Sequence, residues 1–167
     1  MAKQIITVIP GDGIGPDIID ATIKVLDKAG CDFEYEYADA GLTALENHGD
    51  LVPESTLALI EKNKIALKGP LTTPVGDGFT SINVTLRKHF QLYANVRPVL
   101  SFKGTKARYE NIDIITIREN TEGMYSGLGQ TLSDDGNYAE ARRLVTREGA
   151  ERIVTFAYET AIKEGRK

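Results

Sequence analysis

The fold is decided by residues 4–29, which read QIITVIPGDGIGPDIIDATIKVLDKA. Gln4 to Pro10 predicts a strand, the glycines that follow predict a tight turn, and Pro16 suits the first turn of a helix. That helix ends at Gly30, and its apolar stripe is expected to consist of Ile18, Ile19, Thr22, Val25, Leu26 and Ala29.

The turn Gly11-Asp-Gly-Ile-Gly15 invites comparison with a dinucleotide-binding loop. The fingerprint G-x-G-x-x-G requires its third glycine at position 16, where this chain has Pro16. We therefore interpret Asp12 and its glycines as structural, with a cofactor contact left open.

The same alternation of strand and helix continues beyond this unit, and it predicts an α/β fold with a mainly parallel sheet flanked by helices. Expected helices are 16–29, 42–47, 53–62, 81–90 and 147–164, and expected strands are 4–10, 33–37, 64–68, 93–101 and 112–118. Residues 125–146 interrupt the pattern. Their two polar segments flank Ser133-Asp-Asp-Gly-Asn137, which predicts a protruding β-hairpin arm that needs another surface to lie on.

Composition excludes several classes of function. The chain has 167 residues and a net charge of −4, and its basic residues form no run, so a nucleic-acid partner is not expected. No apolar stretch of membrane-spanning length and no signal peptide are present, which predicts a cytoplasmic protein without a membrane partner. Cys31 is the single cysteine, and two histidines, His48 and His89, are too far apart in sequence to suggest a metal site.

Residues 68–87 predict a pocket for a small anion with several charges. The segment runs from the end of a strand through a loop rich in Gly, Pro and Thr into a helix with Ser81 as its expected N-cap. Asn83 and Arg87 are four residues apart and share one helix face above the positive end of the helix dipole. Arg97 and Arg118 lie in or at the end of apolar runs, where a guanidinium favours a carboxylate partner.

Several motifs in one order resemble the β-decarboxylating dehydrogenases, the family of isocitrate, isopropylmalate and homoisocitrate dehydrogenases. They are Ile9-Pro-Gly-Asp-Gly-Ile-Gly-Pro-Asp17, Leu71-Thr-Thr-Pro-Val-Gly76, Ala94-Asn-Val-Arg-Pro98 and Ile117-Arg-Glu-Asn-Thr-Glu-Gly-Met-Tyr125. Within the family, Ser81 and Asn83 resemble the isocitrate-specific pattern, whereas isopropylmalate enzymes place apolar or bulkier residues there.

The resemblance implies NAD- or NADP-dependent oxidative decarboxylation of isocitrate to 2-oxoglutarate, assisted by Mg²⁺ or Mn²⁺. It implies that Tyr125 donates the proton to the enol. It further implies that the nicotinamide end of the site includes Lys68, Leu71 and Thr72, and that isocitrate is bound by Thr73, Ser81, Asn83, Arg87, Arg97 and Arg118.

The chain ends at Lys167, where family members continue into the strand with the catalytic lysine, the metal-binding aspartates and the adenosine loop. The resemblance therefore implies the N-terminal half of a dehydrogenase, inactive alone, with its metal ligands elsewhere. Two interwoven, incomplete domains are expected, residues 1–98 and 99–167, with exposed apolar faces and with a homodimer or a complementary C-terminal half as partner. A non-catalytic isocitrate-binding subunit, an isopropylmalate or homoisocitrate dehydrogenase, and a structural interaction module remain as alternatives.

Overall fold

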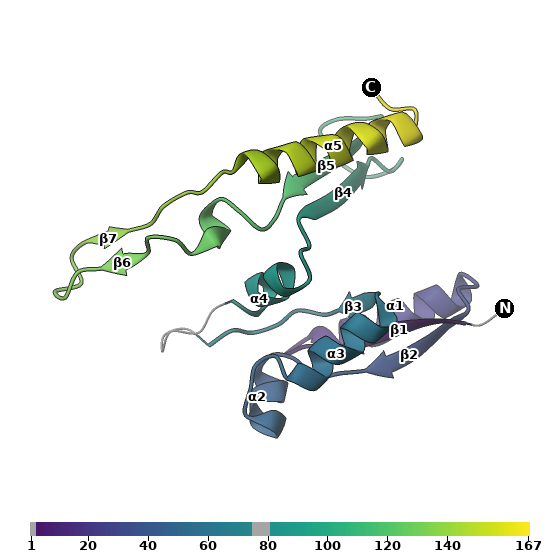
Figure 1. Ribbon diagram of the computed structural model, residues 1–167. Coiled ribbons are helices and arrows are strands. Elements are labelled where there is room, and N and C mark those ends of the chain that lie inside the picture. The colour runs from purple at the N-terminus through teal and green to yellow at the C-terminus, as the bar shows by residue number, and fades with distance from the viewer. Residues whose placement is uncertain (1–2, 75–80) are drawn as a thin grey trace. The chain divides into compact units, whose positions relative to one another are not determined.

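The computed structural model of the protein describes residues 3–74 and 81–167 (Figure 1). The chain forms two compact units, Met1–Thr85 and Leu86–Lys167, and each is described by itself. Every helix and strand expected from the sequence is present, with bounds that agree to within two residues. Part of the predicted loop after the third strand, residues 75–80, lies outside the described residues.

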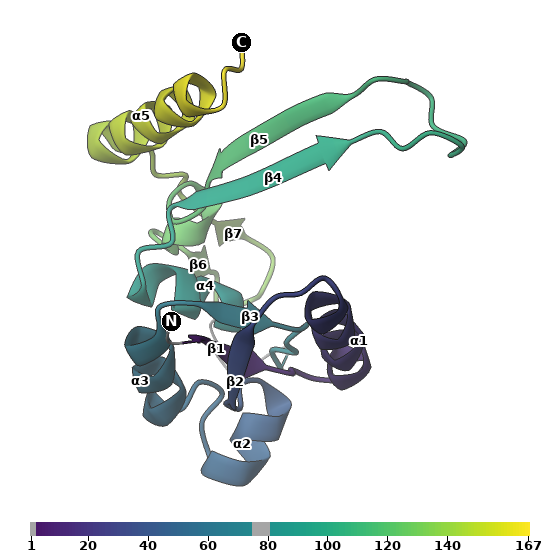
Figure 2. The same cartoon turned by 90° about the vertical axis from the view of Figure 1, so that its right-hand side faces the viewer.

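The first unit contains a three-stranded parallel sheet, which confirms the predicted α/β class. Its strands are β1 (Gln4–Ile9), β2 (Phe33–Tyr37) and β3 (Ala66–Lys68), in the order β2-β1-β3. Helices α1 (Gly15–Lys28) and α3 (Glu54–Asn63) lie on opposite sides of this sheet, as Figure 2 shows. Helix α2 (Leu42–His48) follows β2.

The central strand β1 forms the core of this unit. Ile6, Thr7, Val8 and Ile9 are all buried, as expected for a parallel strand that is covered on both faces. Helix α1 adds the buried side chain of Ile19. Three members of its predicted stripe are wrongly placed, because Ile18 is 45% exposed, Val25 is 67% exposed and Ala29 is also exposed. The buried face of α1 is therefore narrower than the sequence pattern suggests, with Ile19 buried and Ile23 and Leu26 half-buried.

A buried polar contact joins α3 to the sheet. The Asn63 side chain donates to the Thr7 hydroxyl over 3.0 Å and to the Glu36 carboxylate over 2.7 Å. Thr7 in turn donates to the Leu59 carbonyl over 3.2 Å. These bonds satisfy the buried side chains of Thr7 and Asn63, so they fix the position of α3 over β1.

The second unit is built on an antiparallel pair, β4 (Ala94–Leu100) and β5 (Asp113–Glu119), whose register runs from Ala94 opposite Glu119 to Leu100 opposite Asp113. Helix α5 (Arg147–Lys163) packs on β5. Along the chain, β5 is followed by the 3₁₀ turn η1 (Met124–Ser126) and then by the predicted hairpin, which precedes α5. In the hairpin, β6 (Thr131–Leu132) is antiparallel to β7 (Ala139–Glu140).

Apolar surface in this second unit is largely uncovered, which confirms the expectation of exposed apolar faces. Among its described residues, Leu86 is the one large apolar side chain that is buried. On α5, Ile153, Phe156 and Ala157 are only half-buried, and Val154, Tyr158 and Ile162 are 50%, 69% and 80% exposed. Exposed apolar side chains that lie together on one element are typical of surfaces that another chain segment or a partner covers.

Candidate functional site

In the first unit, one carboxylate joins the loops that follow all three strands. Asp12, after β1, accepts hydrogen bonds from the backbone N–H of Leu42 (3.2 Å) and Thr43 (3.2 Å), after β2, and of Thr72 (2.7 Å), after β3. Its own N–H donates to the Pro70 carbonyl over 2.8 Å. Ligand sites in parallel α/β sheets form at the carboxyl ends of the strands, so Asp12 organises the part of the unit where a ligand is expected.

Two glycines make this close approach possible. Gly11 has φ +80°, and a Cβ there would lie 2.0 Å from the Pro70 carbonyl oxygen. A Cβ on Gly41 would lie 2.1 Å from the Asp12 carboxylate. Because any larger residue would collide with these atoms, the glycines serve the packing of the loops.

The Asp12 carboxylate also fills the position where an anion would otherwise bind. Leu42 and Thr43 form the first turn of α2, and their N–H groups are the donors that helix N-termini offer to anions. Burial alone raises the pKa of Asp12, but the hydrogen bonds from Thr72, Thr43 and Leu42 outweigh it and bring the pKa below its usual value. This arrangement supports the structural interpretation of the glycine-rich turn.

The sequence-predicted residues of the first unit lie around the loop after β3. Lys68 ends β3, and its ammonium donates to the Gly69 carbonyl over 2.7 Å. The Thr73 hydroxyl accepts the N–H of Ile82, the first residue of helix α4 (Ile82–His89), over 3.3 Å. Thr72 is held by Asp12 through its N–H, and Leu71 lies beside it. Ser81 directly precedes α4, Asn83 lies in its first turn, and the boundary between the two units falls within this helix.

The remaining four predicted residues belong to the second unit, which brings three of them into contact. The guanidinium carbons of Arg87 and Arg118 each lie 5.5 Å from the centre of the Tyr125 ring. Arg118 Nη2 also donates to the Tyr125 hydroxyl oxygen over 2.8 Å. These residues come from α4, β5 and η1, so three separate elements converge on one aromatic ring.

Arg97 lies on the same face of the β4–β5 pair as Arg118. In the register, Asn95 is opposite Arg118 and Arg97 is opposite Thr116. Residues two apart on a strand share a face, which makes Arg97 the diagonal neighbour of Arg118. Its Nε donates to the Asn95 side chain over 3.2 Å.

Among the described residues, these three arginines have no acidic partner. Within residues 3–74 and 81–167, no carboxylate forms an ion pair with Arg87, Arg97 or Arg118, whereas Arg152 and Arg166 each pair with an acidic side chain. A pocket of about 560 Å³ adjoins Arg118 and Tyr125, and it is also lined by Arg143, which the sequence argument did not select. The dibasic pair Arg142-Arg143 in the arm is the signal that would have indicated it.

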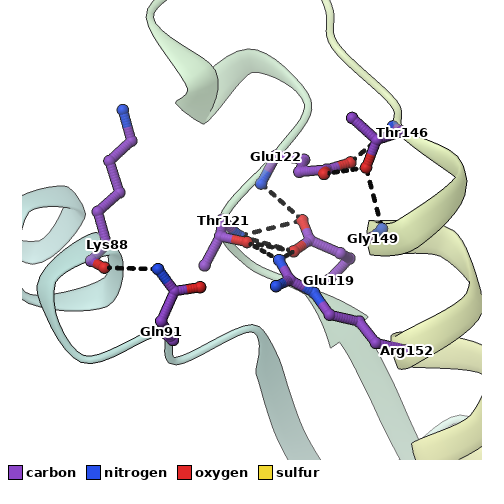
Figure 3. Close-up of polar contacts among 8 residues, drawn as sticks. All are labelled: Lys88, Gln91, Glu119, Thr121, Glu122, Thr146, Gly149 and Arg152. Carbon is purple, nitrogen blue, oxygen red and sulfur yellow. Dashed lines mark hydrogen bonds and ion pairs between the residues drawn. The ribbon is translucent and has the colours of Figure 1, made fainter.

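A polar network fixes the segment between β5 and η1 (Figure 3). The Glu119 carboxylate accepts from the N–H of Thr121 (3.0 Å) and Glu122 (2.7 Å) and from the Thr121 hydroxyl (2.6 Å). Arg152 of α5 donates to the Thr121 hydroxyl over 2.6 Å. Burial raises the pKa of Glu119, but these hydrogen bonds more than compensate and lower it.

A metal centre does not follow from the residues at hand. In the part of the chain that the structure describes, no three His, Cys, Asp or Glu side chains are grouped to hold a metal ion. Across the same residues, no helix is both long enough and apolar enough to span a membrane.

Comparison with known proteins gives one consistent result. The family model described as isocitrate/isopropylmalate dehydrogenase matches residues 5–167. The isocitrate dehydrogenase [NADP] of Thermus thermophilus is 45% identical over 168 residues, which cover 99% of this chain and 34% of that protein. The mitochondrial isocitrate dehydrogenase [NAD] subunit alpha of Macaca fascicularis is 44% identical over 160 residues, 95% of this chain and 45% of that protein.

A solved structure supports the same likeness. The crystal structure of isocitrate dehydrogenase from Methylococcus capsulatus superposes with a TM-score of 0.91 at 46% identity, and the match covers 98% of this chain and 49% of that one. The chain thus spans between about a third and about half the length of these relatives.

Proposed function

Because the chain belongs to the isocitrate/isopropylmalate dehydrogenase family, we propose that the whole protein oxidises and decarboxylates isocitrate to 2-oxoglutarate with NAD or NADP, and that this chain binds the substrate carboxylates. Both curated relatives described above are named as isocitrate dehydrogenases, one with NADP and one with NAD. The observation that carries the proposal is the convergence of Arg87 and Arg118 on Tyr125, with no acidic partner for either arginine in the described part of the chain.

The arginines supply charge and geometry for a polyanion. A planar guanidinium pairs with a carboxylate through two parallel hydrogen bonds, and a tricarboxylate offers a partner to each of Arg87, Arg97 and Arg118. In the first unit, we propose that Thr73, in the loop after β3, and Ser81 and Asn83, at the start of α4, are neutral donors. Lys68, at the end of β3, and Leu71 and Thr72, on the loop that Asp12 holds, are proposed to line the nicotinamide end.

The hydrogen bond at Tyr125 suits a proton donor. Arg118 donates to the hydroxyl oxygen, so the phenol hydrogen stays available for another acceptor. We propose that this hydrogen passes to the carbon of the enol that remains after carbon dioxide has left. The positive charge of Arg118 stabilises the phenolate that the transfer leaves behind.

Other parts of the active site are assigned outside these residues. A divalent cation, Mg²⁺ or Mn²⁺, would require carboxylate ligands that are not grouped among the described residues, so no step is derived through it. Interwoven domains 1–98 and 99–167, a homodimer or complementary half, and the inactivity of the isolated chain remain proposals. The Macaca fascicularis relative is described as mitochondrial, so a cytoplasmic location also remains a prediction.

Isothermal titration of the purified chain with isocitrate in the presence of magnesium tests the carboxylate site. We expect selective binding of isocitrate over isopropylmalate, and a loss of at least about tenfold in Arg118→Ala, since a hydrogen bond to a charged group is worth about 1.5–3 kcal/mol. Arg147→Ala is the matched control, because Arg147 is exposed and paired with Glu151. A folded chain that binds neither acid, or binds both equally, would contradict the assignment.

A further inference from the structure

We propose that Glu122 is a positioning residue for Tyr125, acting by fixing the base of the hairpin arm to the first turn of α5. This inference rests on the proposed function, because the role of Tyr125 as proton donor belongs to that function. Glu122 lies three residues before Tyr125, and its carbonyl accepts the Tyr125 N–H over 3.3 Å. A shift of Glu122 is therefore passed directly to the turn η1.

The Glu122 carboxylate holds the start of α5 with both oxygens. Oε2 accepts the Thr146 N–H over 2.9 Å, and Oε1 accepts the Thr146 hydroxyl at short range. Thr146 is the N-cap of α5, and its hydroxyl oxygen accepts the Gly149 N–H over 2.9 Å. Figure 3 shows this chain of bonds from Glu122 through Thr146 to Gly149. The carboxylate thus extends the helix cap to the segment that carries Tyr125.

Backbone pairing closes the arm at the same point. Gly123 donates its N–H to the Leu144 carbonyl over 2.8 Å, and Leu144 donates back over 3.3 Å. The two ends of the arm are therefore joined next to Glu122 and Thr146. Since both ends are tied, the turn η1 cannot change its position without breaking either this bridge or the carboxylate bonds.

The glycine at position 149 gives independent support. Glycine in a helix costs about 1 kcal/mol relative to alanine, so an interior glycine needs a reason. A Cβ at Gly149 would lie 2.4 Å from the Glu122 carboxyl carbon and 2.5 Å from each of its oxygens. Gly149 is buried, and its φ is not in the left-handed region, so a Cβ there would act on the structure by displacing the Glu122 carboxylate from Thr146.

Gly149→Ala is the decisive variant because it displaces Glu122 while raising the helix propensity of α5. The measurement is the set of nuclear Overhauser effects between the Tyr125 ring and the Arg118 side chain, in protein with labelled tyrosine and arginine. We expect these signals in the unaltered chain and in the control Glu148→Gln, which changes an exposed acid in the same helical turn. We expect them to be lost in Gly149→Ala and in Glu122→Ala, with the helix content by circular dichroism retained in Gly149→Ala.

Isocitrate binding provides the second measurement, with an expected loss of about tenfold in Gly149→Ala, the weakening that corresponds to a misplaced hydrogen-bond partner. Glu122→Ala removes the acceptor of the helix cap, so if it unfolds α5 the decision rests on Gly149→Ala. Unchanged signals between Tyr125 and Arg118 in Gly149→Ala would overturn the proposal and leave Glu122 as a helix cap alone. The spectra need no isocitrate, so a chain that shows the signals without binding isocitrate contradicts the proposed function and not the positioning role.

Discussion

Removal of the Asp12 carboxylate is expected to release the loop after β3 from the rest of the first unit. In Asp12→Ala, the N–H groups of Leu42, Thr43 and Thr72 lose their acceptor. Two of these bonds act as an N-cap for α2, which is worth about 1 kcal/mol. The third, from Thr72 to a charged acceptor, is worth about 1.5 kcal/mol. The sum is about 2.5 kcal/mol, which corresponds to a roughly seventyfold increase in the equilibrium constant for opening this loop junction.

Amide hydrogen exchange at Thr72 and Leu42 measures this opening locally, so it does not require the two units to unfold together. Asp12→Asn keeps the size of the side chain but replaces one carboxylate oxygen by a donor that faces other donors, so we expect it to lose protection as well. Asp17→Asn is the control, since Asp17 is an exposed acid in the first turn of α1. Equal protection of the Thr72 amide in the unaltered chain, Asp12→Ala, Asp12→Asn and Asp17→Asn would refute the reasoning.

The pH dependence follows from the lowered pKa of Asp12. A carboxyl whose pKa is lower in the folded state stabilises that state above its unfolded pKa, which is about 3.9 for aspartate. We expect protection of Thr72 to be constant near neutral pH and to fall as the pH drops below about 4 and through the folded pKa. Asp12→Ala should show no such fall at this junction.

Three further predictions concern stability, titration and association. Asn63→Leu should destabilise the first unit by about 1–3 kcal/mol in urea unfolding, because Thr7 and Glu36 lose a buried donor. The control Asn47→Leu, at an exposed position, should change the stability little, and equal unfolding midpoints of the two variants would contradict this reasoning. Asp135 should titrate with a pKa of about 2 by carbon NMR, because the side chains of Ser133 and Asn137 and the Asn137 N–H donate to it. An ordinary value would contradict these hydrogen bonds. The isolated chain should self-associate through its uncovered apolar surface, as measured by analytical ultracentrifugation. Ile162→Glu, at a position 80% exposed, should reduce this association, and a monomeric unaltered chain would contradict the prediction.

The elements of the fold were accessible from the sequence because their signals are local. The strand, glycine turn and proline-initiated helix of residues 4–29 identify a βα unit within one short stretch. The turn sequence at 133–137 likewise predicted the hairpin, which the pairing of Thr131 with Glu140 confirms. The sequence predicted burial less well, since Ile18 and Val25 follow the helical period but are exposed on α1.

Within the candidate site, the sequence alone identified which side chains have the chemistry for a polyanion, namely Arg87, Arg97 and Arg118, with Tyr125 among them. Tertiary structure alone decided which of them meet and what holds them. Asp12 finds its donors 30, 31 and 60 residues away, and Glu122 bonds Thr146 24 residues along the chain. Periodicity and propensity describe neighbours within a few residues, so contacts between loops that only the packed sheet and helix bring together leave no pattern in the chain. The positions of the reactive groups therefore depend on contacts of Asp12 and Glu122 that the motifs containing these two residues do not reveal.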